Sequence, residues 1–398
     1  MVSTSVIDRN VLRLTAAQAL AGANATVVYA TGALIGDALA PDKALATLPI
    51  TIFVVGMATC TLPAGAIAQR YGRRPVFMLG ALCGVLVGLL AALGIVLTSF
   101  PIFCVAMLFG GAYAAVVLSF RFAAAECVAP ERRAKALSFV MAGGVLAGIL
   151  GPQTVTLTMN LWPTHLFAAT YLAGAGIAVL SAIVLAGVRL PAVKASDAGG
   201  GRPLPEIFRQ PRLITAMLCG VISYTLMNFL MTSAPLAMHH HGLPLAASNL
   251  ALQWHVIAMY GPSFFTGSLI TRFGPGKIVL AGLVLIAAAA IAGIAGMEVG
   301  HFWVSMVLLG VGWNFGFVGA SAMVLECHHP QERTRVQAMN DFVVFGAMVM
   351  GSFASGGLLN HYGWEVICWL ALPPVAVAAA TLMASEAARR RAVATRAA

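Results

Sequence analysis

Twelve apolar runs, each long enough to cross a lipid bilayer, follow one another along the chain with mostly short connections between them. A membrane-spanning helix needs about 20 such residues. A water-facing surface could not be covered here, because only 9% of the residues are charged, against about 25% in soluble proteins. We therefore predict an all-α integral membrane protein with twelve transmembrane helices, near residues 11–36, 44–68, 75–97, 100–125, 134–158, 165–188, 212–238, 247–271, 276–297, 300–325, 335–359 and 363–385.

The formal net charge of +10 comes from lysines and arginines that fall mainly on alternate connections. Arg132 and Arg133 follow the fourth run and Arg335 follows the tenth, whereas an intervening connection carries Glu298. Cytoplasmic loops are enriched in Lys and Arg, so we predict that both termini are cytoplasmic. The composition is typical of a bacterial protein, which makes the inner membrane the expected location. The basic balance reflects topology, and no nucleic-acid partner is predicted.

Several other classes of protein are disfavoured by what the sequence contains. The seven cysteines form no CxxC pair, so we predict neither disulfides nor a metal site. The sequence has no HExxH, GxxxxGK[ST] or GxSxG motif, and no loop is long enough for a catalytic or sensor domain. A membrane enzyme or receptor is therefore an unfavoured alternative, and no cofactor is expected.

The two halves of the chain repeat each other. Gly65–Gly72 after the second run matches Gly267–Gly274 after the eighth, at an offset of 267 − 65 = 202 residues. Residues 133–138 match residues 335–340 at the same offset. Such a parallel repeat implies a pseudo-two-fold axis along the membrane normal. We predict a six-helix bundle at 1–190, a cytoplasmic linker at 191–211 and a second bundle at 212–398.

The segment after the second run reads Gly65-Ala-Ile-Ala-Gln69-Arg70-Tyr71-Gly72-Arg73-Arg74. It resembles the loop signature of the major facilitator superfamily, and span count, repeat and central linker extend the resemblance over the whole chain. The resemblance implies a secondary transporter that moves a small solute by alternating access, usually as a monomer. It also implies a gating latch formed by Gly65, Gln69, Arg70, Gly72, Arg73, Arg74, Glu126, Arg272 and Glu326.

This latch departs from the family pattern at Gln69, where the family usually has Asp. An amide cannot form the usual charge pair, so the latch should be weaker or differently connected. We expect Glu126 to pair with Arg73 or Arg70, and Glu326 to pair with Arg272. Ordinary interfacial charges are the alternative explanation.

Two signatures of proton-coupled drug antiporters are degraded. Ala106 stands four residues before Gly110, where the fourth-span signature has Arg. The fifth-span motif survives only as Gly143, Gly148 and Gly151-Pro152. These losses favour solute uptake, and multidrug or metabolite efflux remains the alternative function.

The resemblance places the substrate cavity at the bilayer midplane, between the two halves. Polar and aromatic residues near span centres are therefore candidates for substrate binding: Gln18, Tyr29, Tyr113, Tyr224, Asn228, Gln253, Trp254, His255, Trp313 and Asn314. A mid-span tyrosine often bonds only a neighbouring helix, and Trp254 could instead lie in an interfacial aromatic belt. The amides are favoured for the cavity, because an unsatisfied amide is costly to bury.

Charged residues inside the spans are functional candidates by default. Arg121 and Asp341 each lie about one and a half turns inside a span, so they could pair, or Asp341 could titrate in proton coupling. Asp341 could alternatively be a helix-start residue favoured by the helix dipole. The usual pKa of histidine near 6.5 suits coupling, so His255 is predicted either to carry protons or to bond the substrate.

The candidate set is mostly neutral amide and aromatic, which favours an uncharged, planar, hydrogen-bonding solute. The segments Gln253-Trp254-His255, Gly312-Trp313-Asn314 and Asn340-Asp341-Phe342 are similar to a small proteobacterial branch of the superfamily that takes up riboflavin. This resemblance implies uptake of riboflavin or a related flavin. Its isoalloxazine ring would stack on aromatic side chains, and its pyrimidine edge suits amides.

Overall fold

The computed structural model describes residues 8–42, 45, 47–190 and 201–397, and its long elements are all helices. The first half contributes six helices long enough to cross a membrane: α1 (Arg9–Leu39), α2 (Leu48–Tyr71), α3 (Arg73–Val96), α4 (Phe100–Glu126), α5 (Arg133–Thr158) and α6 (Ala168–Ala186). A 3-10 turn, η2 (Pro130–Arg132), joins α4 to α5. Of the predicted linker, residues 191–200 lie outside the described residues, and the rest contains the short helix α7 (Leu204–Ile207).

The second half repeats this arrangement, except that one crossing is split into α9 and α10 and another contains a π-helix. Its elements are α8 (Pro211–His240), α9 (Leu245–Tyr260), α10 (Ser263–Phe273), α11 (Pro275–Ile294), α12 (Val299–Trp313), the π-helix η4 (Asn314–Val318), α13 (Gly319–Leu325) and α14 (Arg333–Ala397). The α14 segment contains two crossings that meet at Gly363, where φ is 78°. Elements α12, η4 and α13 together make one crossing.

The predicted eighth span is interrupted between α9 and α10 at Gly261-Pro262. Proline has no amide hydrogen and its ring clashes with the preceding turn, so it breaks a helix. Eleven helical segments of the described chain are individually long and apolar enough to cross a membrane. The pair α9–α10 completes the twelve crossings predicted from the sequence, so the all-helical membrane fold is confirmed.

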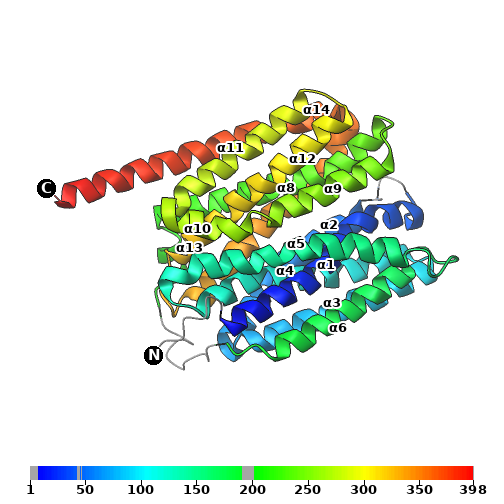
Figure 1. Cartoon of the computed structure of the whole chain (residues 1–398), viewed down its shortest axis with the longest axis horizontal. Coiled ribbons are helices and arrows are strands. Elements are labelled where there is room, and N and C mark those ends of the chain that lie inside the picture. The colour runs from blue at the N-terminus through cyan, green and yellow to red at the C-terminus, as the bar shows by residue number, and fades with distance from the viewer. Residues whose placement is uncertain (1–7, 43–44, 46, 191–200, 398) are drawn as a thin grey trace.

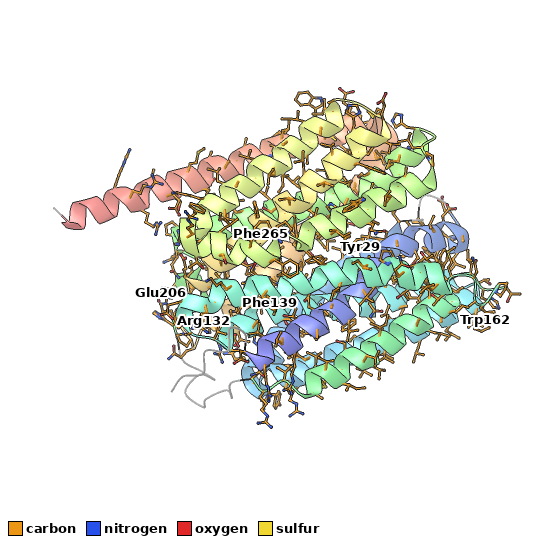
Figure 2. The ribbon with its side chains drawn as sticks, viewed as in Figure 1. Tyr29, Arg132, Phe139, Trp162, Glu206 and Phe265 are labelled. Carbon is orange, nitrogen blue, oxygen red and sulfur yellow. The ribbon has the colours of Figure 1, made fainter. Side chains whose placement is uncertain are left out.

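Helices α1 to α6 fill one side of the bundle and α8 to α14 fill the other (Figure 1). The chain begins α1 and ends α14 at the same end of the bundle, which we call the basic end because Arg73, Arg133 and Arg333 lie there. Arg132 and Glu206 mark this end in Figure 2, and Trp162 marks the opposite end. The two halves contact each other through α2 with α14 and through α5 with α9 and α10.

Close packing of the helices depends on small residues, which let membrane helices approach when no water drives them together. A Cβ on Gly111 of α4 would lie 1.8 Å from the carbonyl oxygen of Phe53 in α2. In the second half, a Cβ on Gly282 of α11 would lie 2.3 Å from the amide nitrogen of Gly316 in η4. Backbone therefore touches backbone in both halves, and neither glycine can be enlarged without separating two helices.

Candidate functional site

A cavity lies between the two halves, beside the middle of α1, and encloses about 1010 Å³ of empty space, any open solvent included. Helices α1, α2, α3, α4 and α6 line it on one side, and α8 and α9 on the other. No charged residue lines it among the described residues. The lining residues with polar, aromatic or sulfur-bearing side chains are Gln18, Asn24, Thr26, Tyr29, Phe53, Met57, Tyr113, Tyr171, Tyr224, Met227, Met231, Met259 and Tyr260.

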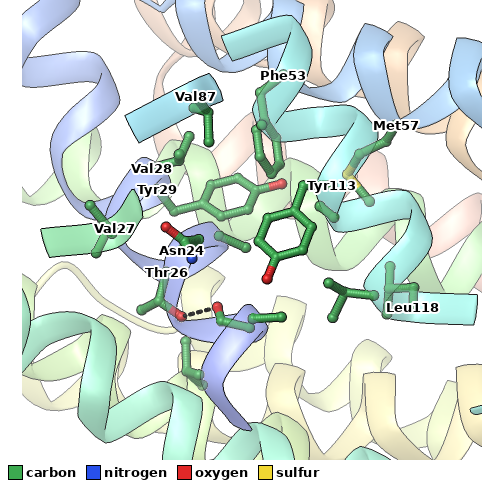
Figure 3. Close-up of a pocket in the computed structure, with 18 of the residues that line it drawn as sticks. Asn24, Thr26, Val27, Val28, Tyr29, Phe53, Met57, Val87, Tyr113 and Leu118 are labelled. Carbon is green, nitrogen blue, oxygen red and sulfur yellow. Dashed lines mark hydrogen bonds between the residues drawn. The ribbon is translucent and has the colours of Figure 1, made fainter. Parts of the chain in front are cut away.

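Helix α1 supplies two buried amides to the cavity. Gln18 is 2% exposed and Asn24 is 8% exposed, and neither Gln18 Oε1 nor Asn24 Nδ2 has a hydrogen-bond partner in the protein. Asn24, Tyr29 and Tyr113 converge on the same space in Figure 3, whereas Thr26 donates to the Gly22 carbonyl at 3.3 Å. Unpaired buried polar atoms are costly. The two amides therefore offer one acceptor and one donor to a bound molecule or to water.

Aromatic rings form two of the cavity walls. Tyr29 packs edge-on against Phe53 with ring centroids 5.5 Å apart. On the other half, Trp313 lies edge-to-face with both Tyr224 and Tyr260, at 5.4 and 5.6 Å. Trp313 itself is fully buried behind these tyrosines and does not line the cavity. The sequence predicted Trp313 as a binding residue, and the structure places it as the support of two tyrosines that do line the cavity.

One hydrogen bond joins the halves beside the cavity. The Tyr29 hydroxyl donates to Asn228 Oδ1 of α8 at 3.2 Å, and Asn228 Nδ2 has no partner. Asn228 is fully buried. The Tyr29–Asn228 hydrogen bond must break whenever α1 and α8 move apart.

A buried ion pair lies between the cavity and the basic end. Arg121 Nη2 of α4 donates to Asp341 Oδ1 of α14 at 2.6 Å, and the side chains are 0% and 6% exposed. The Arg121 guanidinium carbon lies over the rings of Phe122 and Phe317, 4.2 and 4.7 Å from their centroids. The pairing considered from the sequence is thus present and crosses from one half to the other.

A second cluster of contacts closes the basic end between the halves. Arg73 of α3 lies 2.6 Å from Glu126 of α4 and also donates to Gln337 Oε1 of α14 at 2.6 Å. Arg333 Nε lies 3.8 Å from Glu126 Oε1. Gly65 of α2 packs directly on α14, because its Cβ would lie only 2.3 Å from the Cβ of Ala338. We call this cluster the basic-end gate.

The second half does not form the ion pair that was expected as the equivalent of Arg73 with Glu126. Glu326 pairs with Arg212 of α8, and Arg272 lies over the ring of Phe273 at 5.1 Å, so the predicted Glu326–Arg272 pair was wrong. The reason is visible in the repeat, since Arg73 corresponds to position 73 + 202 = 275, which is Pro275.

The other predicted latch residues are distributed around the gate. Arg70 lies over the ring of Tyr71 at 5.2 Å, and Arg74 donates to the Ala186 carbonyl at 3.2 Å. Gln69 and Gly72 line a small pocket beside Arg73 and Glu126. Of the residues in this loop, Gly65 and Arg73 are those with the contacts that join the two halves.

The polar residues predicted on α9 point away from the cavity. Trp254 is 48% exposed on the outside of the bundle, Gln253 is partly exposed, and His255 is fully buried with Nδ1 2.7 Å from the Met306 carbonyl oxygen. The cavity face of α9 is instead Leu252, Val256, Met259 and Tyr260, a helical stripe at i, i+4, i+7 and i+8. Placing Trp254 in the cavity was wrong, because polarity alone does not fix which face of a helix is presented.

The side chain of Asn314 holds neighbouring helices together and does not face the cavity. Its Nδ2 donates to the Met259 carbonyl and to Ser263 Oγ, both at 2.6 Å, and its Oδ1 accepts from Thr266 Oγ1 at 2.7 Å. These bonds join η4 to the break between α9 and α10. Asn314 therefore donates to a backbone carbonyl beside the break, and it does not line the cavity.

Sequence reasoning missed some lining residues altogether. Asn24 and Tyr171 line the cavity but were not predicted, although an amide in the middle of an apolar span is a readable signal. Asn24 lies six positions after Gln18 on α1, off the i, i+4 stripe that Gln18 begins. Tyr171 lies near the start of α6, far from the centre of its span.

Comparison with known proteins agrees with this architecture. The family model described as Major Facilitator Superfamily matches residues 14–261 and 216–397. The chain belongs to this superfamily of transporters. It is 47% identical over 380 residues to the riboflavin transporter RfnT of Brucella anthropi, covering 95% of this chain and 96% of that protein. It is 29% identical to an uncharacterized MFS-type transporter, YddS of Bacillus subtilis, covering 88% of this chain and 84% of that protein.

Solved structures show the same fold at low sequence identity. The human organic anion transporter MFSD10 superposes with a TM-score of 0.75 at 14% identity, covering 94% of this chain and 99% of that chain. The family match and the similarity to RfnT make the chain a multi-pass membrane transporter of a small molecule.

Proposed function

We propose that this transporter takes up riboflavin, or a closely related flavin, across the bacterial inner membrane. The observation that carries the proposal is the cavity itself, which combines stacking tyrosines and a phenylalanine with two unpartnered amides and lacks charge among the described residues. An isoalloxazine ring is planar and stacks on aromatic faces, and methionine sulfur also packs well against such rings. The similarity to RfnT, itself named a riboflavin transporter, supports the same solute.

Transport proceeds by alternating access between bundles 1–190 and 212–398, with one monomer as the working unit. In the described state the basic-end gate is closed. Its opening breaks the contact of Arg73 with Gln337 and separates Gly65 from Ala338. The arginine-rich basic end faces the cytoplasm by the positive-inside rule, which puts both termini there. Substrate from the opposite side therefore reaches the cavity before the gate opens.

Protons drive accumulation through Asp341 and its partner Arg121. The pair lies between the cavity and the basic-end gate and joins the two halves, so protonation of the carboxylate weakens a contact that holds them together. We assign coupling to this pair rather than to His255, because Met306 engages one ring nitrogen of His255 and its ring does not line the cavity.

Expression in a bacterial riboflavin auxotroph that lacks its own importer tests the proposal. Growth on low external riboflavin is the expected result, with cells carrying an empty vector as the control. Absence of growth despite normal membrane expression would reject riboflavin uptake. If the same cells also became resistant to several unrelated toxic compounds, the function would be efflux.

A further inference from the structure

The cavity is neutral, yet an arginine lies immediately behind its wall. Arg121 is on the same helix as Leu118, which lines the cavity, and its Nη1 donates to the Leu118 carbonyl. Phe317 covers the guanidinium at 4.7 Å and itself packs edge-on against Tyr224 at 4.8 Å. Two aromatic side chains therefore separate this cation from the space where a solute binds.

Each nitrogen of this guanidinium already donates a hydrogen bond. Its Nη2 donates to Asp341 Oδ1 at 2.6 Å, its Nε donates to Ser321 Oγ at 3.3 Å, and its Cζ lies over the rings of Phe122 and Phe317. Asp341 is also held by Asn340 Nδ2 at 3.0 Å. The carboxylate thus neutralises Arg121 and fixes it away from the cavity, so Arg121 is not free to receive an anionic group of a ligand.

We propose that the Arg121–Asp341 pair makes the site selective for flavins without a phosphate, so that riboflavin binds and riboflavin 5′-phosphate is rejected. This inference rests on the proposed function. A phosphate would enter a neutral, largely apolar cavity and lose its hydration without gaining a counter-charge, which strongly disfavours its binding. The free oxygen of Gln18 and the free amide of Asn24 suit the neutral hydroxyl and amide groups of riboflavin instead. Asp341 acts through Arg121 and is a positioning residue for this specificity.

If the pair controls specificity, removing its negative charge should change the relative affinity for the two flavins in one direction. A purely structural role would not. In an Asp341→Asn variant the carboxylate charge is removed while the shape of the side chain is retained. Arg121 then carries an uncompensated positive charge behind the cavity wall, and this charge attracts a phosphate. Binding of riboflavin 5′-phosphate should therefore improve relative to riboflavin, whereas simple damage to the fold would weaken both.

Equilibrium binding of the purified full-length protein in detergent tests this, with quenching of flavin fluorescence as the signal. We expect the wild type to bind riboflavin 5′-phosphate at least about 100-fold more weakly than riboflavin. We expect Asp341→Asn to reduce the ratio of the two dissociation constants about tenfold. This factor corresponds to the attraction between unit charges about 10 Å apart at an effective dielectric of about 20.

A second variant guards against misfolding of Asp341→Asn, because an unpaired buried arginine is destabilising. Gln18→Lys adds a cation directly to the cavity wall and should narrow the ratio as well. Gln153→Lys makes the same chemical change at an exposed position of α5 that does not line the cavity, and its ratio should equal that of the wild type.

The outcomes separate the two proposals. A wild type that binds both flavins within about threefold of each other overturns the specificity inference and leaves riboflavin binding intact. A folded Asp341→Asn protein that keeps the wild-type ratio overturns it as well, and if that variant does not fold, an unchanged ratio in Gln18→Lys does so. A folded wild type that binds neither flavin contradicts the proposed function, and the specificity inference fails with it.

Discussion

Substitution of Gly65 by alanine should open the basic-end gate. The added Cβ would lie 2.3 Å from the Cβ of Ala338, whereas carbon atoms pack at about 3.5–4.0 Å. Because both atoms are attached directly to helix backbones, α2 and α14 must move apart by more than about 1 Å. Overpacking of this kind costs about 1–3 kcal/mol. At about 1.4 kcal/mol per tenfold change, the closed state should lose about 5- to 150-fold in population relative to the open state.

The assay is the alkylation rate of a reporter cysteine, Thr61→Cys, in purified protein whose seven native cysteines have been replaced. Thr61 is 6% exposed and lines a small pocket between α2 and α14, so a maleimide reaches it only when these helices separate. We expect Gly65→Ala to raise the rate by the factor given above. The matched control is Gly176→Ala on α6, where a new Cβ meets nothing within 4 Å.

Two results would refute this reasoning. If Gly65→Ala left the alkylation rate unchanged while the protein stayed folded, the close approach of α2 to α14 would not control access. If Gly176→Ala raised the rate by the same factor, the effect would belong to any added methyl group rather than to the gate.

Three further predictions concern the cavity, the coupling and the linker. Asn24→Leu and Gln18→Leu should each weaken riboflavin binding about tenfold, because each removes a hydrogen bond worth about 1 kcal/mol or more from a buried site. A titration that gives the wild-type affinity would show that these residues do not bind the substrate. Asp341→Asn should abolish accumulation driven by a pH gradient and spare riboflavin exchange across proteoliposomes; unchanged accumulation would end the coupling assignment. Arg202 forms hydrogen bonds of 2.8 and 2.9 Å to Glu332 and lowers the pKa of that carboxyl below its usual value. The resulting stability is complete above about pH 4.3 and is lost as the pH falls through the folded pKa. Glu332→Gln should therefore flatten the decline of Tm as the pH falls below about 4.3, and an equally steep decline would contradict this assignment.

The fold could be read from the sequence because the bilayer imposes a strong rule. Any crossing segment must be apolar and must satisfy its own backbone, so length and hydropathy identify helices directly. The repeat of Gly65–Gly72 at Gly267–Gly274 then divided the chain. The break in the eighth crossing was missed, since Gly261-Pro262 interrupts the helix but leaves the hydropathy continuous.

The site could be read only in part, because side-chain direction depends on how each helix is rotated in the bundle. On α1, Gln18 and Tyr29 were predicted and do line the cavity. On α9 the polar residues were chosen, and the face that lines the cavity turned out to be largely apolar. A membrane helix can present apolar residues both to lipid and to a substrate that is itself largely aromatic. Polarity therefore does not distinguish the two faces.

The ion pairs at the basic end could also be predicted only in part. Glu126 was predicted to meet Arg73 or Arg70 and does meet Arg73, because the loop signature brings both to the basic end. Glu326 was assigned by analogy within the repeat, but Pro275 replaces the equivalent arginine and Arg212 from α8 takes its place. A repeat conserves the position of helices, whereas each ion pair depends on both of its partners.

Uptake of radiolabelled riboflavin into proteoliposomes containing only the purified protein tests the central claim most directly. We predict saturable uptake that unlabelled riboflavin competes away and that Asn24→Leu with Gln18→Leu strongly reduces. Uptake no greater than in protein-free liposomes, measured with protein shown to be folded, would contradict the assignment of this cavity to a flavin.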